Sequence, residues 1–223
     1  MKLVTSKWEH SYCLGDGECY ETIIENPFVF RDYIESLKTQ IEGLDGPFVL
    51  SKKLKLLKLK DHAILIDNPL SLESSNKRIS SKIVSLLKDQ ASSEDFIIDT
   101  SEILSAIARY AEKLSDYSDY SIKYDDPDIA GIIKILNFEI DLEYETPLER
   151  LAEYFNVLHS LCGISVFILI NAISFFSIEE LRELITFCIS QKHSVILLNS
   201  YQKNLNIENL KVSIIDEDCC EIQ

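Results

Sequence analysis

The spacing of hydrophobic positions changes along the chain and predicts strands near both ends with helices between them. Near the amino terminus, short apolar runs predict extended segments, and apolar residues at helical spacing predict two helices. The expected strands cover 20–27, 47–59 and 62–70, and the expected helices cover 28–43 and 76–90. The polar residues at 60–62 are expected to form a hairpin-like turn between the last two strands.

The middle of the chain is helical in its pattern and strongly acidic. Apolar residues recur at helical spacing over 99–118, and the pattern resumes over 125–140 after a proline break. A further helix is expected to start at Pro147, because Thr146 suits the N-cap position and Glu149 completes a capping box. We therefore expect a helical subdomain over 92–162.

The last third of the chain returns to alternating strands and helices. Residues 164–173 form a nearly unbroken apolar run, which is typical of a parallel strand buried on both faces. A capped helix over 177–193 and strands at 194–200 and 210–218 follow, and this order implies right-handed parallel crossovers. The predicted fold is an α/β head with a mostly parallel sheet, formed by 1–91 and 163–223, with a helical leg inserted in it.

Composition indicates a folded protein outside the membrane. Of the 223 residues, 46% are hydrophobic, which is enough for a substantial core. No apolar run is long enough to cross a bilayer, and the amino terminus lacks the features of a secretory signal, so we expect a cytoplasmic protein. The six cysteines include no CxxC pair, which favours reduced thiols.

Charge is distributed unevenly along the sequence. The formal net charge is −15, yet residues 51–90 carry nine basic and four acidic side chains. Such an acidic chain is not expected to bind nucleic acid with its whole surface. A concentrated basic patch can nevertheless supply the local field that attracts phosphate.

Motifs for nucleotide hydrolysis and nucleophilic catalysis are missing from the sequence. Nothing matches GxxxxGK[ST], GxGxxG, GxSxG or HExxH. The glycines at 14–18 stand beside carboxylates, so this stretch is expected to be a turn. Asn171 follows the apolar run, where a Walker-type ATPase would carry a magnesium-binding aspartate. These features predict a protein without catalytic activity.

The lysines within residues 52–60 are candidate DNA-binding residues. If this stretch is a strand, alternation places Lys53 and Lys55 on one face, with Lys58 and Lys60 sharing a face further along. Binding should be insensitive to base sequence, because lysines offer point charges to phosphates. Alternatively, the lysines protect an edge strand from aggregation. With the helix that follows, the candidate residues are Lys52, Lys53, Lys55, Lys58, Lys60, Lys77, Arg78 and Lys82.

A row of carboxylates at 139–145 is a candidate metal site. In an extended chain all of them would point to the same side, and this crowding is unfavourable unless a cation lies among them. Calcium fits better than zinc, because calcium prefers oxygen ligands and no histidine or cysteine is nearby. A solvated acidic face before a helix is the alternative. The candidate ligands are Glu139, Asp141, Glu143 and Glu145.

These segments together resemble the short form of the type II-A CRISPR-associated spacer-acquisition protein, the ring-forming member of the Csn family. The resemblance covers almost the whole chain and rests on the order and spacing of its motifs. The matching stretches are IIENPFVFRDYIESL, LIDNPLSLESSNKRISSKIVSLL, NFEIDLEYE, VFILINAISFFSIEELRELITFCI and VSIIDED. The amino-terminal residues 8–20 have no counterpart that we recognise in the family.

The resemblance implies an α/β head with a degenerate P-loop-NTPase-like sheet, an inserted helical leg and a homotetrameric ring. It also implies binding of linear double-stranded DNA ends through a positively charged hole, without sequence preference or catalysis. The ring would be stabilised by Ca²⁺ and would support spacer acquisition beside the CRISPR integrase proteins and the RNA-guided nuclease. On this chain, the acidic run would hold the metal and the lysine segment would line the hole.

Two other functions remain open from the residues alone. One is a metal-dependent nuclease or phosphohydrolase that uses the 139–145 carboxylates with magnesium or manganese. The other is an interaction protein whose lysines only protect an edge strand.

Overall fold

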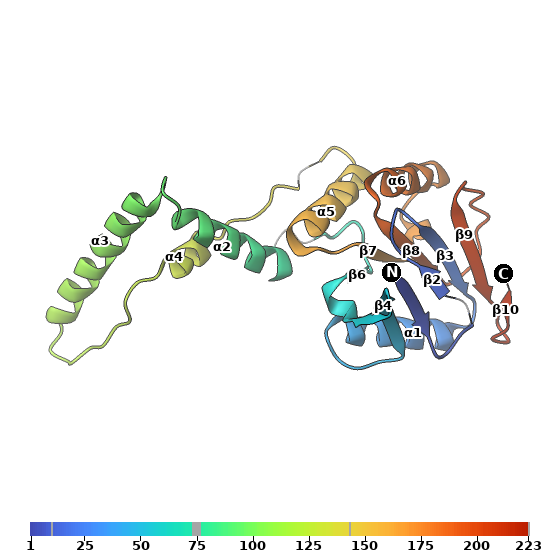
Figure 1. Cartoon of the computed structure of the whole chain (residues 1–223), viewed down its shortest axis with the longest axis horizontal. Helices are drawn as coiled ribbons and strands as arrows, with labels where there is room; N and C mark the ends of the chain where they lie inside the picture. Colours follow the sequence, from blue (N-terminus) through green and yellow to red (C-terminus); the bar gives the residue numbers. More distant parts are fainter. Residues whose placement is uncertain (10, 73–76, 143, 223) are drawn as a thin grey trace. The chain divides into compact units, whose positions relative to one another are not determined.

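The computed structural model of the chain describes residues 1–9, 11–72, 77–142 and 144–222. The chain divides into two compact units (Figure 1). We call Met1–Leu72 with Leu142–Gln223 the head, and Glu73–Asp141 the helical unit. The division therefore falls at other positions than the 92 and 162 expected from the sequence.

The larger sheet of the head combines strands from both ends of the chain. Its strand order is β10-β9-β3-β8-β7-β6. Neighbouring strands are parallel except at the edge, where β10 runs antiparallel to β9. The expected α/β fold is confirmed. The strands are β3 (Cys19–Ile24), β6 (Ala63–Ile66), β7 (Val166–Ile170), β8 (Ser194–Asn199), β9 (Leu210–Ile215) and β10 (Glu221–Ile222).

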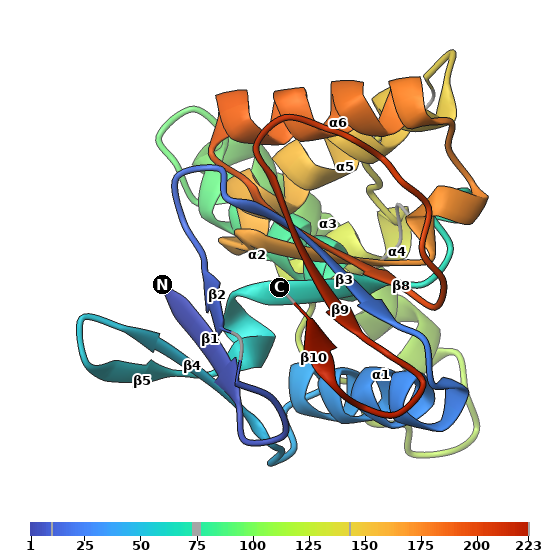
Figure 2. The same cartoon turned by 90° about the vertical axis from the view of Figure 1, so that its right-hand side faces the viewer.

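Helices cover both faces of this sheet. Figure 2 shows α1 (Pro27–Ile41) on one side and α5 (Pro147–Cys162) with α6 (Ile178–Gln191) on the other. The capping box expected at the start of α5 is present, with the Thr146 hydroxyl accepting from the Glu149 N–H at 3.2 Å. We expected α5 to belong to the helical subdomain. It packs in the head because its apolar face is buried, with the Phe155 ring stacked 4.0 Å from that of Phe167 in β7.

A second, antiparallel sheet extends the head, with the order β2-β1-β4-β5. Its strands are β1 (Lys2–Thr5), β2 (Ser11–Cys13), β4 (Phe48–Lys52) and β5 (Lys55–Leu57). One face buries Leu3, Phe48 and Leu50 in the same core cluster as Tyr33 and Leu37 of α1. A short 3-10 helix, Leu59–Asp61, connects β5 to β6. The segment predicted as one strand over 47–59 is thus a hairpin followed by a helical turn.

The helical unit contains α2 (Lys77–Ala91), α3 (Ile97–Asp116) and α4 (Ile129–Leu136). α2 packs against α4, and the unit buries Ile79 and Ile133. None of the residues of α3 is buried. Among the helices that the structure describes, none is both long and apolar enough to cross a membrane. No disulfide joins the cysteines of the described chain.

Candidate nucleic-acid interface

The lysines at 52, 53 and 55 lie at the tip of the β4–β5 hairpin. Leu50 faces Leu57 across the two strands, Lys52 faces Lys55, and only Lys53 and Leu54 form the turn. Both turn residues have positive φ angles, 48° and 64°. The expectation of a single strand over 52–60 is therefore wrong, because the chain reverses direction within it. Lys53 lies in the turn and does not share a strand face with Lys55, and Lys52 and Lys55 are cross-strand neighbours.

The residues of this turn are unfavourable for the conformation that they adopt. Two-residue hairpin turns with positive φ at both positions strongly prefer Asn and Gly. A leucine in the left-handed region costs on the order of 1 kcal/mol or more. Two like charges directly opposite each other also destabilise an antiparallel pair. The residues at the tip therefore disfavour the turn conformation that the fold imposes on them.

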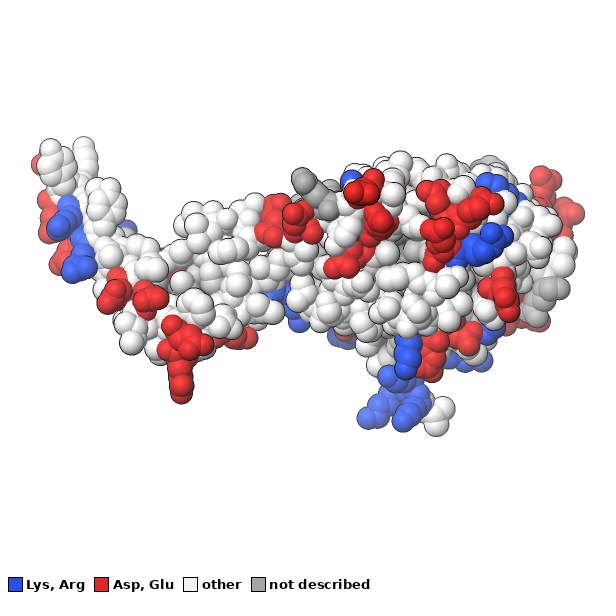
Figure 3. Space-filling view, turned by 90° about the horizontal axis from the view of Figure 1, so that it is seen from above, with Lys and Arg blue, Asp and Glu red and all other residues white. Residues whose placement is uncertain are grey.

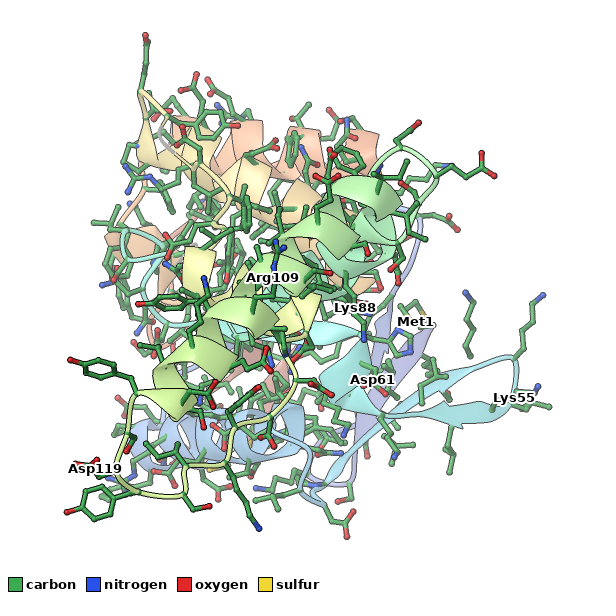
Figure 4. The ribbon with its side chains drawn as sticks, turned by 90° about the vertical axis from the view of Figure 1, so that its left-hand side faces the viewer. Met1, Lys55, Asp61, Lys88, Arg109 and Asp119 are labelled. Atoms are coloured by element: carbon green, nitrogen blue, oxygen red, sulfur yellow. The ribbon has the colours of Figure 1, made fainter. Side chains whose placement is uncertain are left out.

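Charge and exposure are concentrated on the same hairpin. All five lysines of 52–60 are exposed, and Leu54 and Leu56 are 102% and 77% exposed. The head's ion pairs, Lys7 with Asp32 and Lys211 with Glu18, lie elsewhere, and within the described residues none involves the five lysines. Figure 3 shows basic side chains gathered on a projection of the head, with carboxylates scattered over the rest of the visible face. Figure 4 shows Lys55 near the end of the projecting hairpin.

The other two lysines of the segment have different surroundings. Lys58 and Lys60 line a groove of about 310 Å³ together with Gln40, Leu44 and Asp45. Gly43 is also part of the groove, with φ of +105°, and the Lys60 side chain lies over it. The structure thus brings Lys52, Lys53 and Lys55 together at the tip and places Lys58 and Lys60 at its base.

The remaining predicted DNA-binding residues belong to the helical unit. Lys77, Arg78 and Lys82 lie in the first two turns of α2. Lys77 and Lys82 are exposed, and Arg78 is half-buried. Basic residues at the amino-terminal end of a helix oppose its dipole, so helix stability does not explain their position.

The carboxylates predicted to bind calcium lie in irregular chain. Residues 138–142 and 144–146 form neither helix nor strand. Glu139 accepts a hydrogen bond from the Asn137 amide at 2.8 Å. Glu139 and Asp141 belong to the helical unit and Glu145 to the head, and all three are exposed. Glu143 lies outside the described residues. Within the described chain no three Asp, Glu, His or Cys side chains form a metal-binding group, and calcium binding stays a prediction.

Two asparagines that follow parallel strands of the large sheet make structural hydrogen bonds. After β3, the Asn26 side-chain oxygen accepts from the N–H groups of Phe28 and Val29 at 3.1 and 3.3 Å. These are the helix N-terminal amides that a phosphate would otherwise contact. At the end of β7, the Asn171 oxygen accepts from the Ser200 N–H at 2.9 Å and from its hydroxyl at 3.1 Å. Both asparagine side chains therefore accept hydrogen bonds that fix the local backbone.

A buried polar pair in the sheet was not indicated by the sequence. Asn199 of β8 donates to Glu21 of β3 at 2.8 Å, and the two residues are 0% and 2% exposed. Burial raises the pKa of Glu21, and the hydrogen bond from Asn199 opposes the rise. The Asn199 side-chain oxygen is buried without a hydrogen-bond partner in the described structure. Glu21 borders a cavity of about 250 Å³ under residues 202–207.

Helix α3 presents an apolar stripe that its sequence could have revealed. Exposed apolar residues recur at intervals of seven, four, three, four and three, the spacing of a coiled-coil seam. The stripe consists of Ile103, Ile107, Tyr110 and Leu114 of α3, with Phe96 and Tyr117 at its two capping positions.

Comparisons with known proteins place this geometry in context. A family model described as "CRISPR-associated protein (Cas_Csn2)" matches residues 40–219. A search of curated proteins finds no significant match. Chains of solved structures do match, among them "Crystal structure of Stu0660 of Streptococcus thermophilus", with a TM-score of 0.56 and 12% sequence identity. The alignment covers 97% of this chain and 75% of that chain. At 12% sequence identity, the structural similarity shows only that the two chains share a fold.

Proposed function

The chain belongs to the Cas_Csn2 family of CRISPR-associated proteins, and from this premise we propose that it binds ends of linear double-stranded DNA as a calcium-stabilised homotetrameric ring. Membership implies a role in CRISPR spacer acquisition and confirms the family resemblance noted in the sequence. The observation that carries the DNA-binding proposal is the cluster of exposed lysines on the hairpin, which have no ion-pair partner in the described structure.

The charge distribution of the head supports a localised DNA contact. The head has 14 basic and 23 acidic residues, and five of the basic ones lie within residues 52–60. An acidic surface repels a duplex, so DNA would be attracted to the hairpin and away from the rest of the head. Lysine makes point-charge contacts to phosphates, and binding would not depend on base sequence.

The apolar stripe of α3 supports assembly of several copies. A helix with no buried residue and an exposed apolar stripe is marginal alone, because helices gain most of their stability from packing. A second copy of the same helix would cover the seam by coiled-coil packing. The number of subunits in our proposal, four, comes from the family resemblance.

The chemistry of the carboxylate run supports calcium as the stabilising ion. Glu139, Asp141 and Glu145 offer oxygen ligands, which calcium prefers, and their exposure leaves them accessible. When bound, the ion would neutralise neighbouring carboxylates of this acidic segment. The described residues do not form a complete site.

The proposal includes no catalytic activity and interprets the large sheet as a degenerate nucleotide-hydrolase-like sheet. Its support is the hydrogen bonding of Asn26 and Asn171, which occupies the groups that phosphate and magnesium would need. The integrase proteins and the RNA-guided nuclease of the CRISPR system are the proposed partners.

A gel-shift comparison of linear and covalently closed circular DNA of the same sequence tests the proposal. We expect the linear form to be bound and the closed circle to be bound far more weakly, with both forms left uncut. The triple variant Lys52→Ser, Lys53→Ser, Lys55→Ser should lose binding. A matched triple of exposed lysines away from the hairpin, Lys38→Ser, Lys113→Ser, Lys123→Ser, makes the same charge change and should retain it. Equal binding of both DNA forms, or none, would contradict the proposal.

A further inference from the structure

The tip of the hairpin combines features that neither folding nor solubility explains. Leu54 is fully exposed in a left-handed conformation that Asn or Gly would adopt with less strain. Lys53 and Lys55 flank it in sequence, and Lys52 lies opposite Lys55. A lysine-only tip would protect the edge strand equally well, so the leucine is the residue that needs a reason. Violations of local rules in natural proteins are expected where a surface is functional.

We propose that Leu54 is an apolar wedge that packs on the exposed face of the terminal base pair of duplex DNA, while Lys52, Lys53 and Lys55 contact the adjacent phosphates. This inference rests on the proposed function and adds to it the means by which an end is distinguished from the interior of a duplex. A ring alone distinguishes the two only by topology.

The chemistry of a duplex end matches the tip. Inside a duplex, each base pair is stacked on both faces, and a leucine enters only by unstacking a step. The last base pair has one apolar face open to water, with phosphates at its margin. Leu54 would bury its side chain on this face without unstacking. An anion beside Lys52 and Lys55 would also relieve the repulsion between these two opposed charges.

Two other anionic occupants fit the tip less well. An anionic membrane would attract the lysines, but membrane anchoring needs a larger apolar surface than a single leucine at a hairpin tip provides. An acidic protein would offer carboxylates to the lysines, but charge attraction alone leaves the exposed Leu54 side chain without a contact. Membership in a CRISPR-associated family favours DNA over both.

A fluorescent base at the terminal pair tests the wedge. The probe is a blunt duplex carrying 2-aminopurine in the last base pair, and the control is the same duplex with 2-aminopurine at its centre. With the wild-type protein, binding should change the fluorescence of the terminal probe and leave the central probe unchanged. Leu54→Asn should abolish the terminal change and weaken end binding by about tenfold.

The lysines remain in this variant, so the dependence of its affinity on salt should match that of the wild type. Leu54→Asn should also fold at least as well as the wild type, because Asn tolerates positive φ, and Leu54→Gly serves as a second variant for the same reason. The matched control is Val49→Thr, which removes an exposed apolar group from the same hairpin away from the turn. It should behave like the wild type in every assay.

The outcomes separate this inference from the function on which it rests. Binding of linear DNA with an unchanged terminal signal would overturn the wedge and leave DNA-end binding intact. Failure of the wild-type protein to bind linear DNA would overturn both. Leu54-dependent binding to phosphatidylserine vesicles or to a polyglutamate peptide, with no terminal signal on DNA, would assign the tip to a different partner and also overturn the wedge.

Discussion

At the scale of single residues, the most unusual group of the head is the carboxyl of Glu21 inside the sheet. It faces Asn199, whose oxygen lacks a hydrogen-bond partner within the described structure. Burial disfavours the charged carboxylate and raises the pKa of Glu21 above its ordinary value of 4.5. A protonated carboxyl can donate to the Asn199 oxygen, whereas the carboxylate cannot. The pair is therefore better satisfied when it carries no charge.

Glu21→Gln should raise the free energy of unfolding at pH 7 by about 1 kcal/mol, because the amide is neutral and can both accept from and donate to Asn199. The folded pKa of Glu21 is raised, so the wild type loses stability as pH increases from 4.5 through the folded pKa. The stabilisation by the variant should consequently shrink toward zero as the pH falls below 4.5.

Urea denaturation at several pH values checks this expectation. Glu183→Gln, at an exposed position of α6, is the matched control and should change stability little at any pH. A Glu21→Gln protein that is less stable than the wild type at pH 7 would show that the carboxylate is stabilised by a contact that these hydrogen bonds do not include.

At the scale of elements, the β4–β5 hairpin should respond to one substitution in two opposite ways. Lys55→Glu converts the repulsive pair with Lys52 into an attractive one and should stabilise the protein by up to about 1 kcal/mol. The same change places a carboxylate at the proposed DNA contact and should weaken DNA binding by more than tenfold. Thermal unfolding and a filter-binding assay measure the two effects.

Lys38→Glu is the control for this charge reversal, since Lys38 is exposed on α1. It should leave DNA binding nearly unchanged. If both reversals weakened binding equally, only the net charge of the protein would matter, and the hairpin would have no special place in DNA recognition.

Helix α3 should control assembly. Ile107→Asp with Leu114→Asp places two charges in the apolar stripe and should reduce the mass of the assembly in solution, because the seam can no longer be covered by another copy. Sedimentation or light scattering measures the mass. Ser101→Asp with Ser105→Asp puts the same charge on exposed positions on the opposite face of α3 and should keep the assembly intact. Unchanged mass in the stripe variant would exclude α3 as the assembly surface.

At the scale of the whole molecule, our proposal makes assembly and DNA binding depend on the neutralisation of acidic side chains by bound calcium. Removal of calcium leaves the acidic segment un-neutralised, so a chelator should lower the mass of the assembly and weaken binding to linear DNA together. Re-addition of calcium should restore both, and magnesium should restore them less well. Mass and affinity that are unaffected by a chelator would remove calcium from the proposal while leaving the lysine contacts in place.

The parts of the fold that the sequence predicted are those with local causes. The capping box at Thr146 involves residues three apart, and the buried strands β7 and β8 are continuous apolar runs. The pairing of β3 with strands more than 170 residues away could not be read from any window. The position of α5 in the head likewise depends on a long-range stack between Phe155 and Phe167.

The sequence predicted which charged residues belong to the candidate site, but it did not predict how the backbone arranges them. The charges of 52–60 are visible in the sequence, but the turn at Lys53 and Leu54 lacks the Asn and Gly that announce a two-residue hairpin. The alternation at 139–145 suggested an extended row. A strand requires a neighbouring chain to pair with, and the described residues of this stretch are not assigned to a strand.

The position of β3 between β8 and β9 has a consequence for the synthesis of the protein. Cys19–Ile24 is made about 170 residues before Ser194, and at roughly 5–20 residues per second translation takes about ten to thirty seconds to cover that interval. Throughout this delay, a strand that is buried along its whole length in the finished protein has neither of its neighbours. The nascent chain must keep it soluble on the ribosome, and messages truncated before β8 would release a polypeptide with a permanently unpaired, aggregation-prone segment.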